Sequence, residues 1–226
     1  MVPSTAREAA ALGNAAPPAD LLDLDKFAAT PLVREPFDFL IVPGFVKAAA
    51  LAAVNRDFPD IAKPGSFPHA TLSYGPVFRQ LVEEMEGPRF RAAVEAKFGM
   101  DLSGRPTVLT VRGMTDTRDG SIHTDSKTKL ITVLVYFNEG WEVEGGRLRL
   151  LRSATDLEDY AAEVEPGYGT LLVFRRSDNS WHGHKPYVGK RRTIQMNWVT
   201  DESVKQREEA RHGFSAKLKT LFGVGR

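Results

Sequence analysis

The chain has 226 residues, of which 42% are hydrophobic, and its 30 basic and 29 acidic side chains leave a formal charge of +1. This balance argues against a protein whose whole surface binds nucleic acid or membranes. The absence of cysteine excludes disulfides, Cys-ligated zinc, iron–sulfur clusters and thiol nucleophiles. Any metal chemistry must therefore use carboxylates, water and the five histidines.

The length fits a single domain with a small appendage. We expect a flexible lead-in over 1–30 and one domain over 31–226. The lead-in is rich in alanine and proline but has no basic start followed by an apolar stretch, so it is not typical of a secretory signal. The longest strongly apolar run, Leu130 to Phe137, is far shorter than the roughly 20 residues that cross a bilayer. These features favour a cytoplasmic protein without membrane association.

Residues 31–104 are predicted to form a mainly helical support. A short strand near 37–41 comes first, because apolar residues alternate there before Pro43-Gly44 breaks the pattern. Apolar residues at helical spacing then predict a helix over 45–57 and two further helices over 78–85 and 90–98.

After residue 105 the apolar period changes from about 3.6 to 2, which indicates strands. Because no helical stretches alternate with them, we expect a sandwich or a jelly roll rather than a parallel sheet. The predicted class is mainly β (α+β), a cupin-like double-stranded β-helix over 105–200, followed by a charged helix over 203–222. The eight strands are expected near 107–112, 121–125, 129–137, 146–151, 161–165, 169–174, 181–185 and 191–199.

Two imidazoles and a carboxylate form the main candidate site. His123 and Asp125 lie two residues apart in a predicted strand, so their side chains share a face. His182 follows in a strand that a jelly roll can place beside the first. Such a set suits non-heme Fe(II) with open coordination positions, and catalytic zinc is the competing metal.

The other histidines are assigned separately. His69 is read as an ordinary loop residue and His212 as an exposed residue of the C-terminal helix. His184 lies two residues after His182, on the same predicted face, so it is a competing ligand.

Arg191 and Arg192 follow His182 by nine and ten residues, at the start of an alternating strand. A guanidinium beside a metal centre can hold a carboxylate bidentately, which points to a metal-chelating dicarboxylate. Strand parity places the two arginines on opposite faces, so at most one points inward. The alternative is that both lie on a solvated face.

The order of several motifs resembles the Fe(II)/2-oxoglutarate-dependent dioxygenases, in particular their prolyl 4-hydroxylase-like branch. The resemblance covers roughly residues 107–200. It rests on these elements in order: His123-Thr-Asp125, Leu130 to Asn138 leading into Trp141, Gly145-Gly146-Arg-Leu-Arg-Leu, Glu165-Pro166-Gly167, Gly169 to Phe174, His182 with Pro186, and a basic residue before a strand ending in Trp198.

The resemblance implies that His123, Asp125 and His182 ligate the iron. It favours His182 over His184 because the family places a proline four residues after the ligand, as Pro186 is. The carboxylate of Asp125 favours hydroxylation, because related halogenases lack a carboxylate at that position.

The resemblance also implies the cosubstrate site. In the family, the basic residue that holds the distal carboxylate of 2-oxoglutarate lies six positions before the aromatic that corresponds to Trp198, which selects Arg192, with Arg191 as the alternative. Tyr136 matches a position whose hydroxyl often shares that carboxylate, and Thr132 and Leu134 are expected on the same strand face.

Fe(II), 2-oxoglutarate and O2, with ascorbate as a further reductant, are the cofactors that the family implies. The expected reaction hydroxylates a peptidyl, including prolyl, or small-molecule substrate and releases succinate and CO2. Substrate contacts are expected from the loops 114–120 and 177–179, with Arg112 and Arg118 as candidates for an acidic group. Asn138 and Trp141 are expected to be structural.

Two other functions remain open. The same jelly roll can host a cupin-like metal- or sugar-binding protein without redox turnover. Oxidation of nucleic acid is ranked below it, because the basic cluster Lys185, Lys190, Arg191 and Arg192 lacks interleaved aromatics for base stacking.

Overall fold

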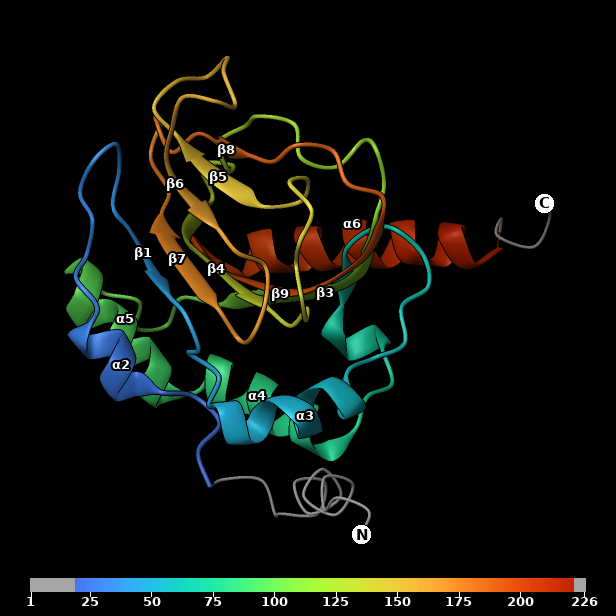
Figure 1. The fold of residues 1–226 in the computed structure, drawn as a ribbon. Helices are drawn as coiled ribbons and strands as arrows, with labels where there is room; N and C mark the ends of the chain where they lie inside the picture. The colour runs from blue at the N-terminus through green and yellow to red at the C-terminus, as the bar shows by residue number, and fades with distance from the viewer. Residues whose placement is uncertain (1–18, 222–226) are drawn as a thin grey trace, which may run out of the picture.

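The structure is a computed structural model that describes the backbone of residues 19–221 and the side chains of residues 19–211 (Figure 1). Its helices are α2 (Leu24–Ala29), α3 (Ala48–Asp57), α4 (Pro76–Glu86), α5 (Pro88–Phe98) and α6 (Glu202–Leu221), with a 3-10 turn η1 (His69–Thr71). Its strands are β1 (Phe39–Val42), β2 (Phe67–Pro68), β3 (Thr107–Thr115), β4 (Lys129–Tyr136), β5 (Leu148–Leu151), β6 (Tyr160–Val164), β7 (Leu171–Arg175), β8 (His182–Gly183) and β9 (Gly189–Val199).

The strands form two antiparallel sheets. The large sheet has the order β1-β7-β4-β9-β3-β2, and the small sheet has the order β6-β5-β8. In Figure 1 the helices α2 to α5 gather on one side of the large sheet and the small sheet lies on the other. This arrangement confirms the predicted class of α+β protein with N-terminal helices, a jelly-roll core and a C-terminal helix.

Strand β4 shows how alternation creates these layers. Ile131, Val133 and Val135 are fully buried in the core that the large sheet shares with the helices. Leu134 and Tyr136, on the opposite face, pack in a second core with Leu148, Leu150 and Val164 of the small sheet. Because successive side chains of a strand point to opposite faces, one β-rich segment borders two interiors.

The N-terminal helices are fixed to the large sheet by aromatic packing. Phe90 of α5 contacts Trp198 of β9, with ring centroids 6.0 Å apart, and also Phe27 and Phe45, at 5.8 Å and 5.5 Å. All four rings are at most 2% exposed, so they contribute a large buried apolar area.

The predicted flexible lead-in over 1–30 is wrong for residues 19–30. Leu21, Leu22 and Phe27 are buried in the helix-side core, and Asp23 caps α2 by accepting a hydrogen bond from the backbone of Lys26 at 2.9 Å. The remainder of the lead-in, residues 1–18, lies outside the described residues.

The predicted strand over 121–125 is also wrong. His123 makes a single antiparallel bridge with His182, and its neighbours form no strand. The backbone N–H of each histidine donates to the carbonyl of the other at 3.0 Å, so this one bridge still brings the two segments together.

Among the helices of the described part of the chain, none combines the length and the apolar composition that crossing a membrane requires.

We expect Phe27→Ala to lower the free energy of unfolding by about 3–5 kcal/mol, because it leaves a cavity beside the two buried rings of Phe45 and Phe90. Urea unfolding checks this value, and Val188→Ala is the control because Val188 is 64% exposed. A loss in Phe27→Ala no larger than that of the control would mean that the segment 19–30 does not belong to the core.

Candidate metal centre and cosubstrate pocket

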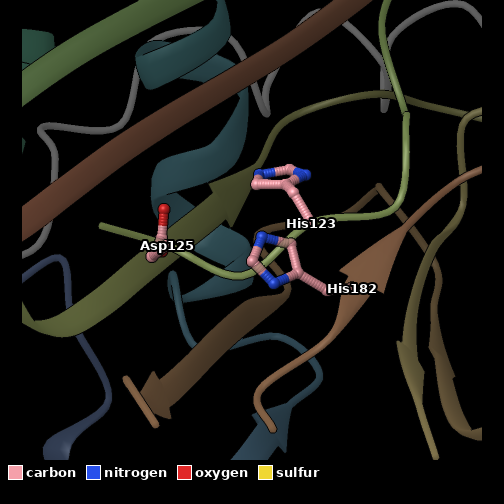
Figure 2. A group of neighbouring side chains, drawn as sticks. All are labelled: His123, Asp125 and His182. Carbon is pink, nitrogen blue, oxygen red and sulfur yellow. The ribbon is translucent and has the colours of Figure 1, made fainter. Parts of the chain in front are cut away.

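His123, Asp125 and His182 converge on one point. One ligand atom of each residue lies within 4.8 Å of those of the other two, and Figure 2 shows the two rings side by side with the Asp125 carboxylate beyond them. His182 begins β8, which pairs with β5, and the bridge described above holds His123 beside it. Asp125 and His182 are buried, whereas His123 is exposed.

Backbone carbonyls fix the tautomers of both histidines. The Nδ1 atom of His123 lies 2.8 Å from the carbonyl oxygen of Ser121, and that of His182 lies 3.0 Å from the carbonyl oxygen of Ser180. Since a carbonyl only accepts hydrogen bonds, both Nδ1 atoms carry the proton. With Nδ1 protonated and donating to a carbonyl, Nε2 is the ring nitrogen that can offer its lone pair to a metal.

The pKa values of His182 and Asp125 favour the protonation states that bind a metal. Burial lowers the pKa of His182 to about 4, and this outweighs the opposing effect of the Asp125 charge, so the ring is neutral at pH 7. Burial alone would raise the pKa of Asp125, but the Lys129 charge and hydrogen bonds from Lys129 and Thr132 bring it below its ordinary value. Two imidazoles beside a carboxylate fit Fe(II) with open positions.

The Asp125 carboxylate is held on both oxygens. Lys129 Nζ donates to Oδ1 at 2.6 Å, and Thr132 Oγ1 donates to Oδ2 at 2.5 Å. Arg176 Nε donates to the backbone carbonyl of Asp125 at 3.2 Å. These contacts place the carboxylate between the start of β4 and the bridge.

The three residues line a cavity of about 330 Å³ between the two sheets. Across β4 and β9, Thr132 pairs with Asn197 and Tyr136 pairs with Thr193. Thr132, beside Asp125, and Tyr136 are four residues apart along β4, so about 13 Å of strand separates the Asp125 end of the cavity from a second end. That second end is lined by Tyr136, His184, Arg191 and Thr193.

Arg191 is the basic residue of this cavity. Its side chain is 5% exposed, its Nε donates to the Gly146 carbonyl at 2.8 Å, and its guanidinium carbon lies 5.2 Å from the Tyr136 ring centroid. Within residues 19–211 it makes no ion pair with a carboxylate. Burial, assisted by the nearby charge of Arg112, lowers the pKa of Arg191. A buried guanidinium in this state is stabilised by a bound anion.

The prediction that Arg192 is the inward residue is therefore wrong. Arg192 lies on the helix side of β9, where its guanidinium carbon is 5.0 Å from the Phe58 ring centroid and its Nη1 donates to the Asn55 carbonyl at 3.2 Å. Trp198 shares that side of the strand and is buried in the helix-side core. Counting back six residues from Trp198 therefore stays on the helix side, and the alternative, Arg191, faces the cavity.

Two buried hydroxyls complete this end of the cavity. Tyr136 OH and Thr193 Oγ1 are inaccessible to solvent and have no well-aligned hydrogen-bond partner among the described residues, although the Arg191 guanidinium lies close to the Tyr136 hydroxyl. Burial raises the pKa of Tyr136, so its hydroxyl keeps its proton and can donate. Orphaned donors beside a buried guanidinium make a cradle for a carboxylate.

Thr132 was expected among the cosubstrate residues, and in the structure its hydroxyl contacts Asp125 and Asn197. Its one hydroxyl proton goes to Asp125, and it accepts a hydrogen bond from Asn197 Nδ2 at 2.8 Å. Thr132 lines the cavity, with its hydroxyl proton directed to Asp125.

His184 is not part of the metal-ligand cluster. It is buried in the cavity wall, where its Nδ1 lies 2.8 Å from the carbonyl of Lys185. Burial, with the Arg191 charge, lowers its pKa to about 4, so the ring is neutral. His69 also lies outside this cluster and contacts Tyr74. The side chain of His212 is outside the described residues.

The residues expected to contact substrate lie in different places relative to the cavity. Arg112 and Arg118 line the cavity, but Arg112 is paired with Asp119 at 3.0 Å and Arg118 with Asp116 at 2.9 Å. The loop 177–179 does not line it, since Asn179 is directed to the Pro36 carbonyl.

The expected structural roles of Asn138 and Trp141 agree with their contacts. Asn138 accepts a hydrogen bond from the Arg192 backbone at 2.7 Å, and Trp141 donates to the Gly145 carbonyl at 3.0 Å.

Several residues that line the cavity were not predicted. Lys129, Thr193, Gln195 and Asn197 line the cavity, as do Glu208 and Arg211 of α6. The polar members of β9 alternate with Ile194, Met196 and Trp198, so their shared face was visible in the sequence. The contribution of α6 depends on tertiary packing and left no such signal.

Comparisons with known proteins agree with this geometry. Residues 111–200, which contain the triad and Arg191, match the model of the 2OG-Fe(II) oxygenase superfamily. No curated protein matches the sequence. The matched segment carries the His-Asp-His cluster, and together they identify this part of the chain as that of a 2OG-Fe(II) oxygenase superfamily enzyme, a class that implies Fe(II) and 2-oxoglutarate.

Solved structures share the fold at low identity. A prolyl-4-hydroxylase from Pseudomonas putida is similar with a TM-score of 0.52 and 17% identity, over 83% of this chain and 97% of that one. A prolyl 4-hydroxylase from Phytophthora capsici is similar with a TM-score of 0.52 and 16% identity, over 86% of this chain and 70% of that one.

A substitution at Gly120 measures how tightly the cavity wall is packed. Its φ is +97°, and a Cβ there would collide with the backbone oxygen and ring of His184. We expect Gly120→Ala to lower the free energy of unfolding by about 1–3 kcal/mol more than Gly104→Ala does. Gly104 has a φ of +67° and open space around it, so its substitution carries backbone strain alone. Urea unfolding of both variants decides, and equal losses would contradict the packing described.

Proposed function

We propose that the protein is a hydroxylase that uses Fe(II) and 2-oxoglutarate to oxidise an unactivated C–H bond of a peptidyl or small-molecule substrate. One observation carries the proposal: a His-Asp-His cluster and the buried Arg191 guanidinium, which has no carboxylate partner within residues 19–211, line the same cavity. The cluster suits the metal, and the guanidinium suits the far carboxylate of the cosubstrate.

The residues have distinct roles in this proposal. His123 and His182 offer Nε2 and Asp125 offers a carboxylate oxygen to iron. Arg191 holds the distal carboxylate, and the hydroxyls of Tyr136 and Thr193 donate to it. When bound, Fe(II) and 2-oxoglutarate supply oxygen activation coupled to oxidative decarboxylation, with succinate and CO2 as products. The protein orients both groups and excludes water between its sheets, and ascorbate as a reductant remains an expectation.

The competing functions find less support. A metal- or sugar-binding module has no need for a buried, unpaired arginine in its metal cavity. The basic cluster considered for nucleic acid is dispersed: Lys185 pairs with Glu144 and Glu158, Arg191 is buried and Arg192 packs on Phe58. The carboxylate of Asp125 favours hydroxylation over halogenation.

Prolyl peptides are the first substrates to test, because the two solved structures of similar fold are of prolyl hydroxylases. Free amino acids and small metabolites form the second panel. Succinate release that depends on one panel member identifies the substrate class.

We expect the anaerobic protein to develop a visible charge-transfer band when Fe(II) and then 2-oxoglutarate are added. Arg191→Ala should weaken 2-oxoglutarate binding by about 30-fold or more, equivalent to about 2 kcal/mol, because the buried charge contact is lost. Titration of the band measures this affinity. Arg192→Ala is the matched control and should bind 2-oxoglutarate as the wild type does. The reverse pattern would place the anchor on the helix side of β9.

We expect His182→Ala to abolish Fe(II) binding, because it removes one of three ligands, whereas His184→Ala should retain it. Equilibrium dialysis under anaerobic conditions measures the bound iron, and far-UV circular dichroism verifies that both variants fold. Iron loss in His184→Ala alone would show that the wrong histidine of the pair has been assigned.

A further inference from the structure

On the face of β4 and β9 that lines the cavity, a series of hydrogen bonds leads to the Asp125 carboxylate. Gln195 Nε2 donates to Asn197 Oδ1 at 3.2 Å, Asn197 Nδ2 donates to Thr132 Oγ1 at 2.8 Å, and Thr132 donates to Asp125 Oδ2 at 2.5 Å. Three neighbouring positions of the large sheet thus lead to one proposed ligand.

The direction of this series follows from its chemistry. An amide NH2 group only donates, so the Thr132 oxygen must accept from Asn197. A hydroxyl has one proton, and that proton is then committed to Asp125. Gln195 occupies the Asn197 oxygen, which keeps the amide of Asn197 turned with its NH2 toward Thr132. Every bond therefore points toward the carboxylate, and such aligned bonds reinforce one another.

Burial makes this series rigid. Thr132 is 1% exposed and Asn197 is 4% exposed, so water does not compete for these contacts. Thr132 and Asn197 are paired directly across β4 and β9, which fixes their separation by the strand register. Lys129, by contrast, reaches the other carboxylate oxygen with a long and partly exposed side chain.

We propose that Thr132, Asn197 and Gln195 are positioning residues that set the orientation of the Asp125 carboxylate relative to the two imidazoles. The inference rests on the proposed metal site and extends it from the three ligands to the strand pair behind them. Groups of this kind orient ligands and raise metal affinity, and their loss typically weakens binding by about 10–100-fold.

The test is Co(II) binding to the metal-free protein, followed by the visible absorption spectrum of the bound ion. Thr132→Val keeps the side-chain shape but removes the donor, so its Co(II) affinity should fall by about tenfold or more and its spectrum should change. Thr132→Ser restores a hydroxyl and should recover most of both. Asn197→Leu removes the donor that fixes the direction of the Thr132 hydroxyl. Its Co(II) affinity should therefore lie between those of Thr132→Val and Thr132→Ser.

Thr110→Val is the matched control. Thr110 is buried in the wall of the same cavity on β3, and its side chain is not part of the series that leads to Asp125. Its affinity and spectrum should equal those of the wild type. If Thr132→Val does not fold, as judged by circular dichroism, the comparison of Asn197→Leu with Thr110→Val decides.

The outcomes separate this inference from the proposed function. The metal site itself would be overturned if the wild-type protein bound no Co(II), or if His182→Ala bound Co(II) as tightly as the wild type does. Wild-type binding that depends on His182 but is unchanged, in affinity and spectrum, by Thr132→Val and Asn197→Leu would overturn the positioning role and leave the metal site standing.

Discussion

Strand β9 separates two interiors of opposite character, and the rest of the molecule is arranged around that division. Its even-numbered side chains Ile194, Met196 and Trp198 belong to the core beneath the helices. The odd-numbered side chains from Arg191 to Asn197 line the polar cavity under the small sheet. Because alternation forces every second residue to the other face, a change of register by one residue would place polar groups in the apolar core. Burial of the apolar face of β9 therefore fixes which side chains of this strand line the cavity.

The small sheet completes the site by bringing a distant segment over this polar face. β8 has only two residues, and His182 is one of them. It pairs with β5 on one side and with His123 on the other. A short strand held on both sides leaves little freedom to its side chains. The position of His182 is therefore set by backbone hydrogen bonds.

Much of this architecture could be predicted from residue patterns. The three longer N-terminal helices and most strands follow the apolar period, and the His-Thr-Asp and His-Gly-His segments identified the cluster before its geometry was known. The six-residue helix α2 was missed because so short a segment has no measurable period and is stabilised mainly by tertiary packing. The choice of Arg192 over Arg191 failed for a different reason. It relied on a count of six residues back from Trp198, and an even count stays on the apolar face of the strand. Arg191 instead has the parity of Thr193, Gln195 and Asn197, which line the cavity.

The bridge between His123 and His182 also links the site to the stability of the whole chain. The two segments that it joins are far apart in the sequence, and their ligand atoms come together only in the folded protein. A cation held by all three side chains would therefore bind the native state and not the unfolded one, and mass action would shift the equilibrium toward folding. The melting temperature would then rise with metal concentration, so that supply of the ion would govern how long the enzyme persists as well as how fast it turns over.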